Sequence, residues 1–217
     1  MIYERKQLVS LSPADAESLT RCEELLLQSF DELRSSASIS VSKDAVETED
    51  GALNGNPSSR FSRLSSHWRG TGEAEELSGE FRIPHLYRAI TKPPPPLAWD
   101  GSSDDERELI RESREIDGTP RSGTGAIVTA RLSTPLEIWL WYRGQPTQMD
   151  VDYLGYLEAL ALTKGTDGWQ YLFTDLSFSD PDLYWIADDM QAMLHHFPRL
   201  FSQYDYTPLH ERLEERL

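Results

Sequence analysis

Cysteine is almost absent from this chain, which has one in 217 residues, Cys22. A single cysteine excludes an intrachain disulfide framework and any cysteine-rich zinc or iron–sulfur cluster, and it is typical of a reducing compartment. Long apolar runs are absent too: no window approaches the roughly 18 apolar residues that span a bilayer, and the first residues lack the apolar stretch of a signal peptide. The sequence therefore predicts a cytoplasmic protein that does not enter a membrane.

Basic side chains are scarce. Lys and Arg number 21 against 37 Asp and Glu, so the formal net charge is −16. Nucleic acids and anionic membranes attract proteins with a basic face, and this composition makes both poor partners. A basic protein is the natural partner of such a chain.

Catalytic motifs are also missing. The sequence has no Gly-x-Ser-x-Gly, no His-Glu-x-x-His and no Cys–His arrangement. The Gly123-Thr124-Gly125 stretch precedes a predicted strand, whereas a phosphate-binding loop follows a strand and opens a helix. His195 and His196 are adjacent on a predicted helix and point about 100 degrees apart, so they do not chelate one ion. We therefore predict no cofactor, no metal and no enzyme.

One cluster of carboxylates is compatible with an enzyme. Asp175, Asp180 and Asp182 supply oxygens of the kind that bind Mg²⁺ or transfer protons, which makes a hydrolase the third candidate function. Asp180 and Asp182 are explained more simply as the cap and first-turn acid of a helix.

What the chain does contain is a folded core, because 38% of its residues are hydrophobic and six are Trp. Residues 1–34 are predicted to hold the N-terminal helix of the main domain, beginning at Ser12-Pro13 and ending near Arg34. Its apolar stripe recurs every three or four residues at Leu19, Cys22, Leu26, Phe30 and Leu33.

The middle of the chain is weakly patterned. Residues 35–66 are rich in Ser, Gly and acidic side chains, which predicts a flexible insertion. Residues 81–90 are compatible with a strand or with a short helix after Pro84, and Pro93–Pro96 form a polyproline connector or a docking element. The charged stretch 104–117 is predicted to be a solvated helix or loop.

Residues 67–217 form the predicted main domain. Residues 126–132 and 136–142 alternate like the strands of an antiparallel hairpin, and a helix capped by Thr147 or Asp150 runs to Lys164. Further helices run from Asp180 to Pro198 and from Thr207 onward. The fold class is therefore α+β, an antiparallel sheet with helices mainly on one face and a C-terminal helical extension. The aromatic segment 168–175 is predicted to be buried between these helices.

The surplus of acidic over basic side chains is largest at the C-terminal end. Residues 150–217 contain thirteen Asp and Glu residues and four Lys and Arg residues, a surplus of nine. An acidic surface that carries aromatic anchors steers and holds a basic protein. On the hairpin, Trp139 and Trp141 lie either under another element, which we favour, or in an exposed patch. The candidate partner-binding residues are Trp139, Trp141, Asp180, Asp182, Asp188 and Asp189.

A family resemblance supports this interpretation. Residues 136–142 followed by 148–160 resemble the closing strand and final helix of the SUKH superfamily, and Ile83-Pro84-His85-Leu86-Tyr87 is similar to the Leu-Pro-x-x-Tyr near the start of such domains. The match covers less than a third of the chain. It implies an α+β bacterial immunity protein that neutralises a toxin. The alternative is a non-catalytic scaffold or adaptor subunit of a larger bacterial assembly.

Overall fold

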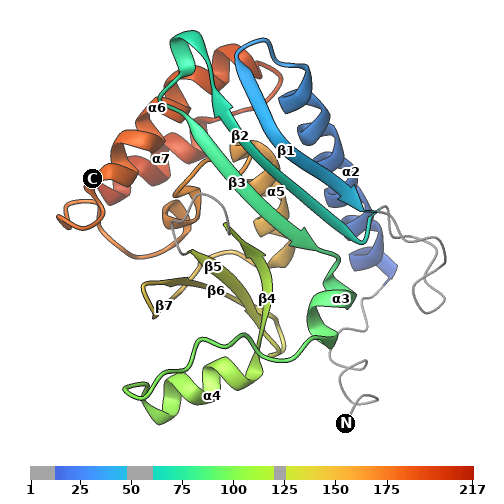
Figure 1. The fold of residues 1–217 in the computed structure, drawn as a ribbon, viewed down its shortest axis with the longest axis vertical. Helices are drawn as coiled ribbons and strands as arrows, with labels where there is room; N and C mark the ends of the chain where they lie inside the picture. Colours follow the sequence, from blue (N-terminus) through green and yellow to red (C-terminus); the bar gives the residue numbers. More distant parts are fainter. Residues whose placement is uncertain (1–12, 48–60, 120–125) are drawn as a thin grey trace.

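The computed structural model describes residues 13–47, 61–119 and 126–217, and it is an α+β fold with two antiparallel sheets (Figure 1). The strand orders are β1-β2-β3 and β4-β5-β6-β7. The elements are α2 (Pro13–Ser35), β1 (Ile39–Glu47), β2 (Arg63–Gly70), η2 (Gly72–Ala74), β3 (Ser78–Pro84), α3 (Leu86–Thr91), α4 (Asp104–Glu112), β4 (Ser113–Gly118), β5 (Ile127–Arg131), β6 (Glu137–Tyr142), β7 (Gln145–Gln148), α5 (Tyr153–Thr163), η3 (Trp169–Phe173), α6 (Tyr184–Leu200) and α7 (Thr207–Arg216).

Helices α2 and α5 lie behind the first sheet, and α4 lies on the outer side of the second (Figure 1). The two sheets adjoin at β3 and β4, where the backbone N–H of Arg82 donates to the carboxylate of Asp117 at 2.7 Å. None of the described helices is long and apolar enough to cross a lipid bilayer.

Helix α2 confirms the predicted apolar stripe. All five stripe residues are buried, while the predicted cap Ser12 lies outside the described residues. The Ser29 hydroxyl donates to the carbonyl of Ala161 at 2.8 Å, which ties α2 to α5. Glu23, expected outside the stripe, is instead buried, with Oε1 3.3 Å from Nε2 of His85.

Cys22 is expected to be unreactive. Burial, followed by the negative charge of Glu158, raises the pKa of its thiol to about 11, so about one molecule in 1,000 carries the thiolate at pH 8. We expect Ellman's reagent to label the folded chain roughly 100-fold more slowly than the urea-unfolded chain. Equal labelling rates would place Cys22 at the surface.

The predicted flexible insertion is wrong at both ends. Residues 39–47 and 63–70 form β1 and β2, which pair along their whole length, and residues 48–60 lie outside the described residues. A register shift between Val41 and Lys43 interrupts the alternation that identifies a strand in sequence. Residues 81–90 are compatible in sequence with a strand or a short helix, and the structure contains both. Strand β3 ends at Pro84, and helix α3 begins at Leu86.

The charged stretch 104–117 is a helix only in its first part. Helix α4 has a capping box at Ser103 and Glu106 and ends at Glu112, where β4 begins. Arg114 and Asp117 are buried in that strand. Because charged residues usually lie on the surface, their presence in the sequence argued against a buried strand. The prediction of a solvated segment is therefore wrong for residues 113–117.

The second half of the chain largely confirms the prediction. Strands β5 and β6 pair antiparallel from Ile127↔Trp141 to Arg131↔Glu137. Helix α5 is capped by Asp152, whose Oδ1 accepts the backbone N–H of Gly155 at 2.8 Å, rather than by Thr147 or Asp150. The last helix, α7, begins at Thr207 as expected.

Helix α6 differs from its prediction at both ends. It begins at Tyr184, after a turn that contains Asp180 and Asp182, and Pro198 lies inside it. A proline in the last turn removes one hydrogen-bond donor, and the helix ends at Leu200 with the N–H of Phe201 donating to Phe197 at 2.7 Å.

Candidate functional site

The two tryptophans proposed as anchors lie under a helix. Trp141 is 2% exposed and packs with Leu109 and Ile110 of α4, while its indole N–H donates to Thr129 at 2.9 Å. Trp139 is half-buried against the same cluster. The favoured alternative, cover by another element, is confirmed. Trp141 is therefore a core residue, and the prediction that it anchors a partner is wrong.

The acidic candidates lie at the start of α6. Asp180, Asp182 and Asp188 are exposed, and Asp189 is half-buried. The Oδ1 atom of Asp180 accepts the backbone N–H of Asp182 at 2.9 Å, as expected of a turn-capping carboxylate. Tyr184, beside them, is 64% exposed. The structure thus brings these acids together with an aromatic side chain, and sets them apart from Trp139 and Trp141.

The hydrolase candidates Asp175, Asp180 and Asp182 are all exposed. Within the described residues, no group of three or more His, Cys, Asp or Glu side chains is placed to hold a metal ion. The guanidinium of Arg143 lies 3.7 Å from the carboxylate of Asp182. The arrangement is that of surface charges on a turn.

The strongly buried polar groups serve the fold. The Tyr156 hydroxyl donates to Oδ2 of Asp117 at 2.6 Å, and both side chains are buried. Nζ of Lys164 lies 2.7 Å from Oε2 of Glu32 and 4.2 Å from the ring centre of Tyr204. Burial lowers the pKa of Lys164 to about 8, although Glu32 acts in the opposite direction. Asp117, Tyr156 and Lys164 are buried away from solvent.

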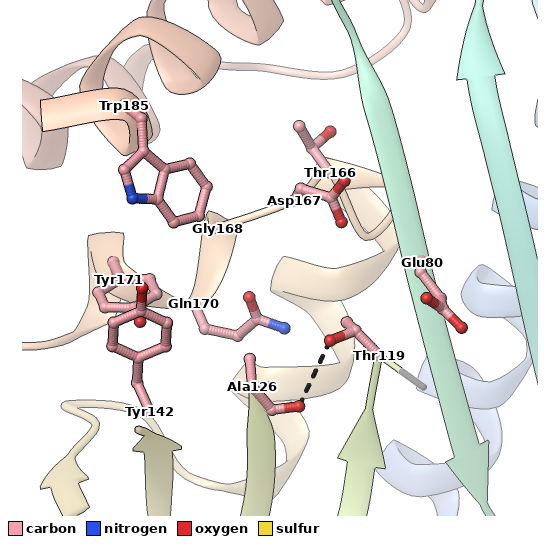
Figure 2. Close-up of a pocket in the computed structure, with 10 residues that line it drawn as sticks. All are labelled: Glu80, Thr119, Ala126, Tyr142, Thr166, Asp167, Gly168, Gln170, Tyr171 and Trp185. Carbon is pink, nitrogen blue, oxygen red and sulfur yellow. Dashed lines mark hydrogen bonds between the residues drawn. The ribbon is translucent and has the colours of Figure 1, made fainter. Parts of the chain in front are cut away.

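One hollow adjoins the acidic start of α6 (Figure 2). We call it the α6 pocket and define it by Tyr142, Asp167, Gln170, Tyr171 and Trp185. Its empty volume is about 280 Å³ when the open solvent in front of it is included, so the enclosed space is far smaller than that of a drug-sized site. It suits a small group.

Backbone hydrogen bonds fix the polar wall of the α6 pocket. After α5 the chain turns through Lys164 and Gly165, which have φ of 56° and 70°, and then runs antiparallel to β3. The N–H of Asp167 donates to Ser78 O at 2.9 Å. Gly168, with φ of 83°, turns the chain into η3. Glycine adopts such angles without a Cβ penalty, so Gly165 and Gly168 allow the two turns that hold Asp167 beside β3.

Three aromatic rings form the opposite wall. The rings of Tyr142 and Tyr171 meet edge to face with their centres 5.7 Å apart, below Trp185 in the view of Figure 2. The Trp185 indole N–H donates to Asp182 O at 3.1 Å, which ties the ring to the acidic turn. Strand β6, η3 and α6 therefore each contribute one ring.

The α6 pocket has a negative electrostatic environment. Burial is the main cause that raises the pKa of Asp167, Glu80 adds to it, and Ser78, His67 and Arg69 oppose it. Burial, together with the charges of Asp167 and Asp188, raises the pKa of Asp189 to about 6. Carboxylates that raise one another's pKa lie close enough to create a field that favours cations.

Sequence reasoning missed the α6 pocket because its residues come from separate elements. Tyr171 was placed in a buried aromatic segment, which is confirmed, and Trp185 lies between stripe positions of α6. The available signal was Gly165 and Gly168, two glycines that bracket an acidic residue between helices.

Comparison of the chain with family models, with curated proteins and with solved structures finds no match in any of the three.

Proposed function

We propose that this protein binds a basic protein partner through the acidic surface at the start of α6. Asp180, Asp182 and Asp188 on that surface are exposed and lie beside the exposed ring of Tyr184. This combination is the observation that carries the proposal, because clustered charges speed the approach of an oppositely charged partner and an exposed aromatic ring provides an anchor after docking.

The partner is proposed to be a bacterial toxin, which the protein neutralises in the cytoplasm as an immunity-type inhibitor. The support for this finer proposal is the resemblance of residues 136–142 and 148–160 to the SUKH superfamily. An inhibitor needs a recognition surface and no catalytic group, and the buried carboxylate of Asp117 accepts hydrogen bonds within the fold.

A scaffold or adaptor is the second candidate. Pro93, Pro94 and Pro96 are exposed, and Trp99 close by is 58% exposed. An extended proline segment with a neighbouring aromatic ring is a recurrent docking element. In that case the binding surface lies beside α4 and not at α6.

The experiment is co-expression with the product of the neighbouring gene, tested as the toxin, followed by affinity measurements on the purified pair. We expect growth to be rescued and affinity to fall as salt is raised, because salt screens the charges that steer the encounter. The triple variant Asp180→Asn, Asp182→Asn, Asp188→Asn is expected to bind about tenfold more weakly at low salt.

The matched control removes three negative charges from α2, as Glu17→Gln, Glu24→Gln and Asp31→Asn. These residues are exposed, and α2 lies on the right of Figure 1, whereas the chain enters α6 on the left. Both triple variants change the net charge equally. An equal loss of affinity in the two would contradict a local surface, and binding that depends on Trp99 without rescue would favour the adaptor.

A further inference from the structure

One face of the first sheet is basic. Side chains alternate along β2, so that every second residue is buried in the core and the basic ones lie on the opposite face. On β3, Arg82 pairs across the strands with Ser65 of β2, which places it on that same face. Figure 1 shows α2 and α5 behind β2 and β3 and no described helix in front of them. We call this set the basic sheet face and define it by Arg63, His67, Arg69 and Arg82.

The exposed charge of the basic sheet face is positive, although the chain as a whole carries −16. Strands β2 and β3 together contain three arginines and one acidic residue, Glu80, which is only 3% exposed. Asp167, which borders β3, is half-buried and accepts the Ser78 hydroxyl at 2.6 Å. The acids next to this face are therefore withdrawn from solvent, whereas Arg69 is exposed.

Two guanidinium groups of this face have unused donors. Among the described residues, neither Arg69 nor Arg82 has a side-chain hydrogen bond or an ion pair. Elsewhere arginines reach acids, as when Arg212 lies 2.7 Å from Asp150. Arg82 is half-buried, so its guanidinium has lost part of its contact with water without gaining a partner. Such a group is suited to an anion supplied from outside the chain.

The length of the basic sheet face indicates what kind of anion fits it. Arg63 and Arg69 are six residues apart in β2, which is about 20 Å at a rise of about 3.3 Å per residue. One phosphate group cannot contact both ends of this line, but an extended peptide can. Single-stranded nucleic acids are held by stacking on aromatic rings, and the aromatic side chains of β2 and β3, Trp68 and Phe81, are buried on the other face.

We infer that the basic sheet face binds a short acidic segment of a partner protein, extended along β2. Carboxylates at every second position of such a segment repeat at about 7 Å, as do the side chains on one face of a strand. Arginine donates two parallel hydrogen bonds to a carboxylate. The net charge of the chain does not prevent this contact, because charges more than about 8 Å away are screened at physiological ionic strength.

This inference does not rest on the acidic surface at α6. A chain that carries both surfaces can hold a basic protein at one and an acidic protein at the other, as an adaptor does.

The test uses an acetylated and amidated octapeptide of four Glu-Thr repeats as the probe, with the backbone NMR signals of the full chain as readout. At low ionic strength we expect saturable shifts confined to β2 and β3, with a dissociation constant below about 1 mM, and at least threefold weaker binding at physiological salt. The uncharged peptide of four Gln-Thr repeats is expected to cause no saturable shift. Pentathymidylate, which also carries four negative charges, is expected to bind at least threefold more weakly.

Matched variants separate this face from the general effect of charge. Arg69→Gln with Arg82→Gln is expected to bind the acidic peptide at least fivefold more weakly. The control, Arg21→Gln with Lys92→Gln, removes two positive charges from α2 and from the end of α3, where neither side chain has an ion pair among the described residues. It is expected to bind as the wild type does. Arg69→Gln alone, at an exposed position, is expected to keep its Tm and to bind at least twofold more weakly.

The absence of saturable shifts in the wild type, equal binding of the Gln-Thr peptide, or equal loss in the two double variants would overturn the inference. Equal or tighter binding of pentathymidylate would also overturn it, in favour of a nucleic acid. The triple variant at α6 is expected to keep its affinity for the acidic peptide. Lost rescue with intact peptide binding therefore contradicts only the proposed function, and intact rescue without peptide binding contradicts only the basic sheet face.

Discussion

Replacing Trp169 by alanine is expected to lower the free energy of unfolding by about 3–5 kcal/mol. The ring is fully buried, and its centre lies 5.0 Å from that of Tyr156 and 5.7 Å from that of Phe173. It therefore joins α5 to η3, and alanine leaves a cavity there. Total stabilities are typically about 5–15 kcal/mol, so urea denaturation should show a large fall in the midpoint.

Two further variants identify the cause. The indole N–H of Trp169 is buried without a partner among the described residues, so Trp169→Phe removes an unsatisfied donor while it keeps much of the apolar surface. We expect it to lose less than half as much stability as the alanine variant. Trp99→Ala, at an exposed position, should change stability by no more than about 0.5 kcal/mol. A stable Trp169→Ala variant that no longer binds its partner would place this ring on the recognition surface.

Elements with one continuous periodic face were predictable from the sequence. The stripe of α2 and the β5–β6 hairpin are examples, because apolar residues recur in each with the period of the element and most of them become buried. Strand β4 was missed for the opposite reason. Asp117 is buried there by accepting hydrogen bonds from Arg82, Gly118 and Tyr156, residues that are distant or uninformative in sequence.

The site was less predictable than the fold. The acids around Asp182 and Asp188 were proposed from local charge density, and the structure places them on one exposed surface. The choice between a buried and an exposed face for Trp141 depended on α4, whose position along β6 no local pattern encodes. The pocket depends on Asp167, Tyr142 and Trp185, which become neighbours only through the packing of β6 and α6 against the turn after α5.

The second large effect is expected at Asp117, which links stability to pH. Burial raises the pKa of this carboxyl from 3.8 to about 6, while hydrogen bonds from Tyr156 and two backbone N–H groups act in the opposite direction. A carboxyl with a raised pKa binds its proton more tightly in the folded chain than in the unfolded chain. Its contribution to stability is therefore fully present below pH 3.8 and is lost as the pH rises through 6, a loss of about 3 kcal/mol.

Asp117→Asn isolates this contribution from those of the other carboxyl groups. The amide oxygen still accepts the N–H groups of Arg82 and Gly118, and the amide nitrogen donates to the Tyr156 oxygen, so the fold is kept without a titrating group. Denaturation midpoints from pH 4 to pH 7 should fall less in this variant than in the wild type. Asp117→Ala leaves three buried donors without an acceptor and should lose about 3 kcal/mol or more at every pH. Parallel pH profiles for wild type and Asp117→Asn would mean that Asp117 titrates normally and that the strand is open to solvent.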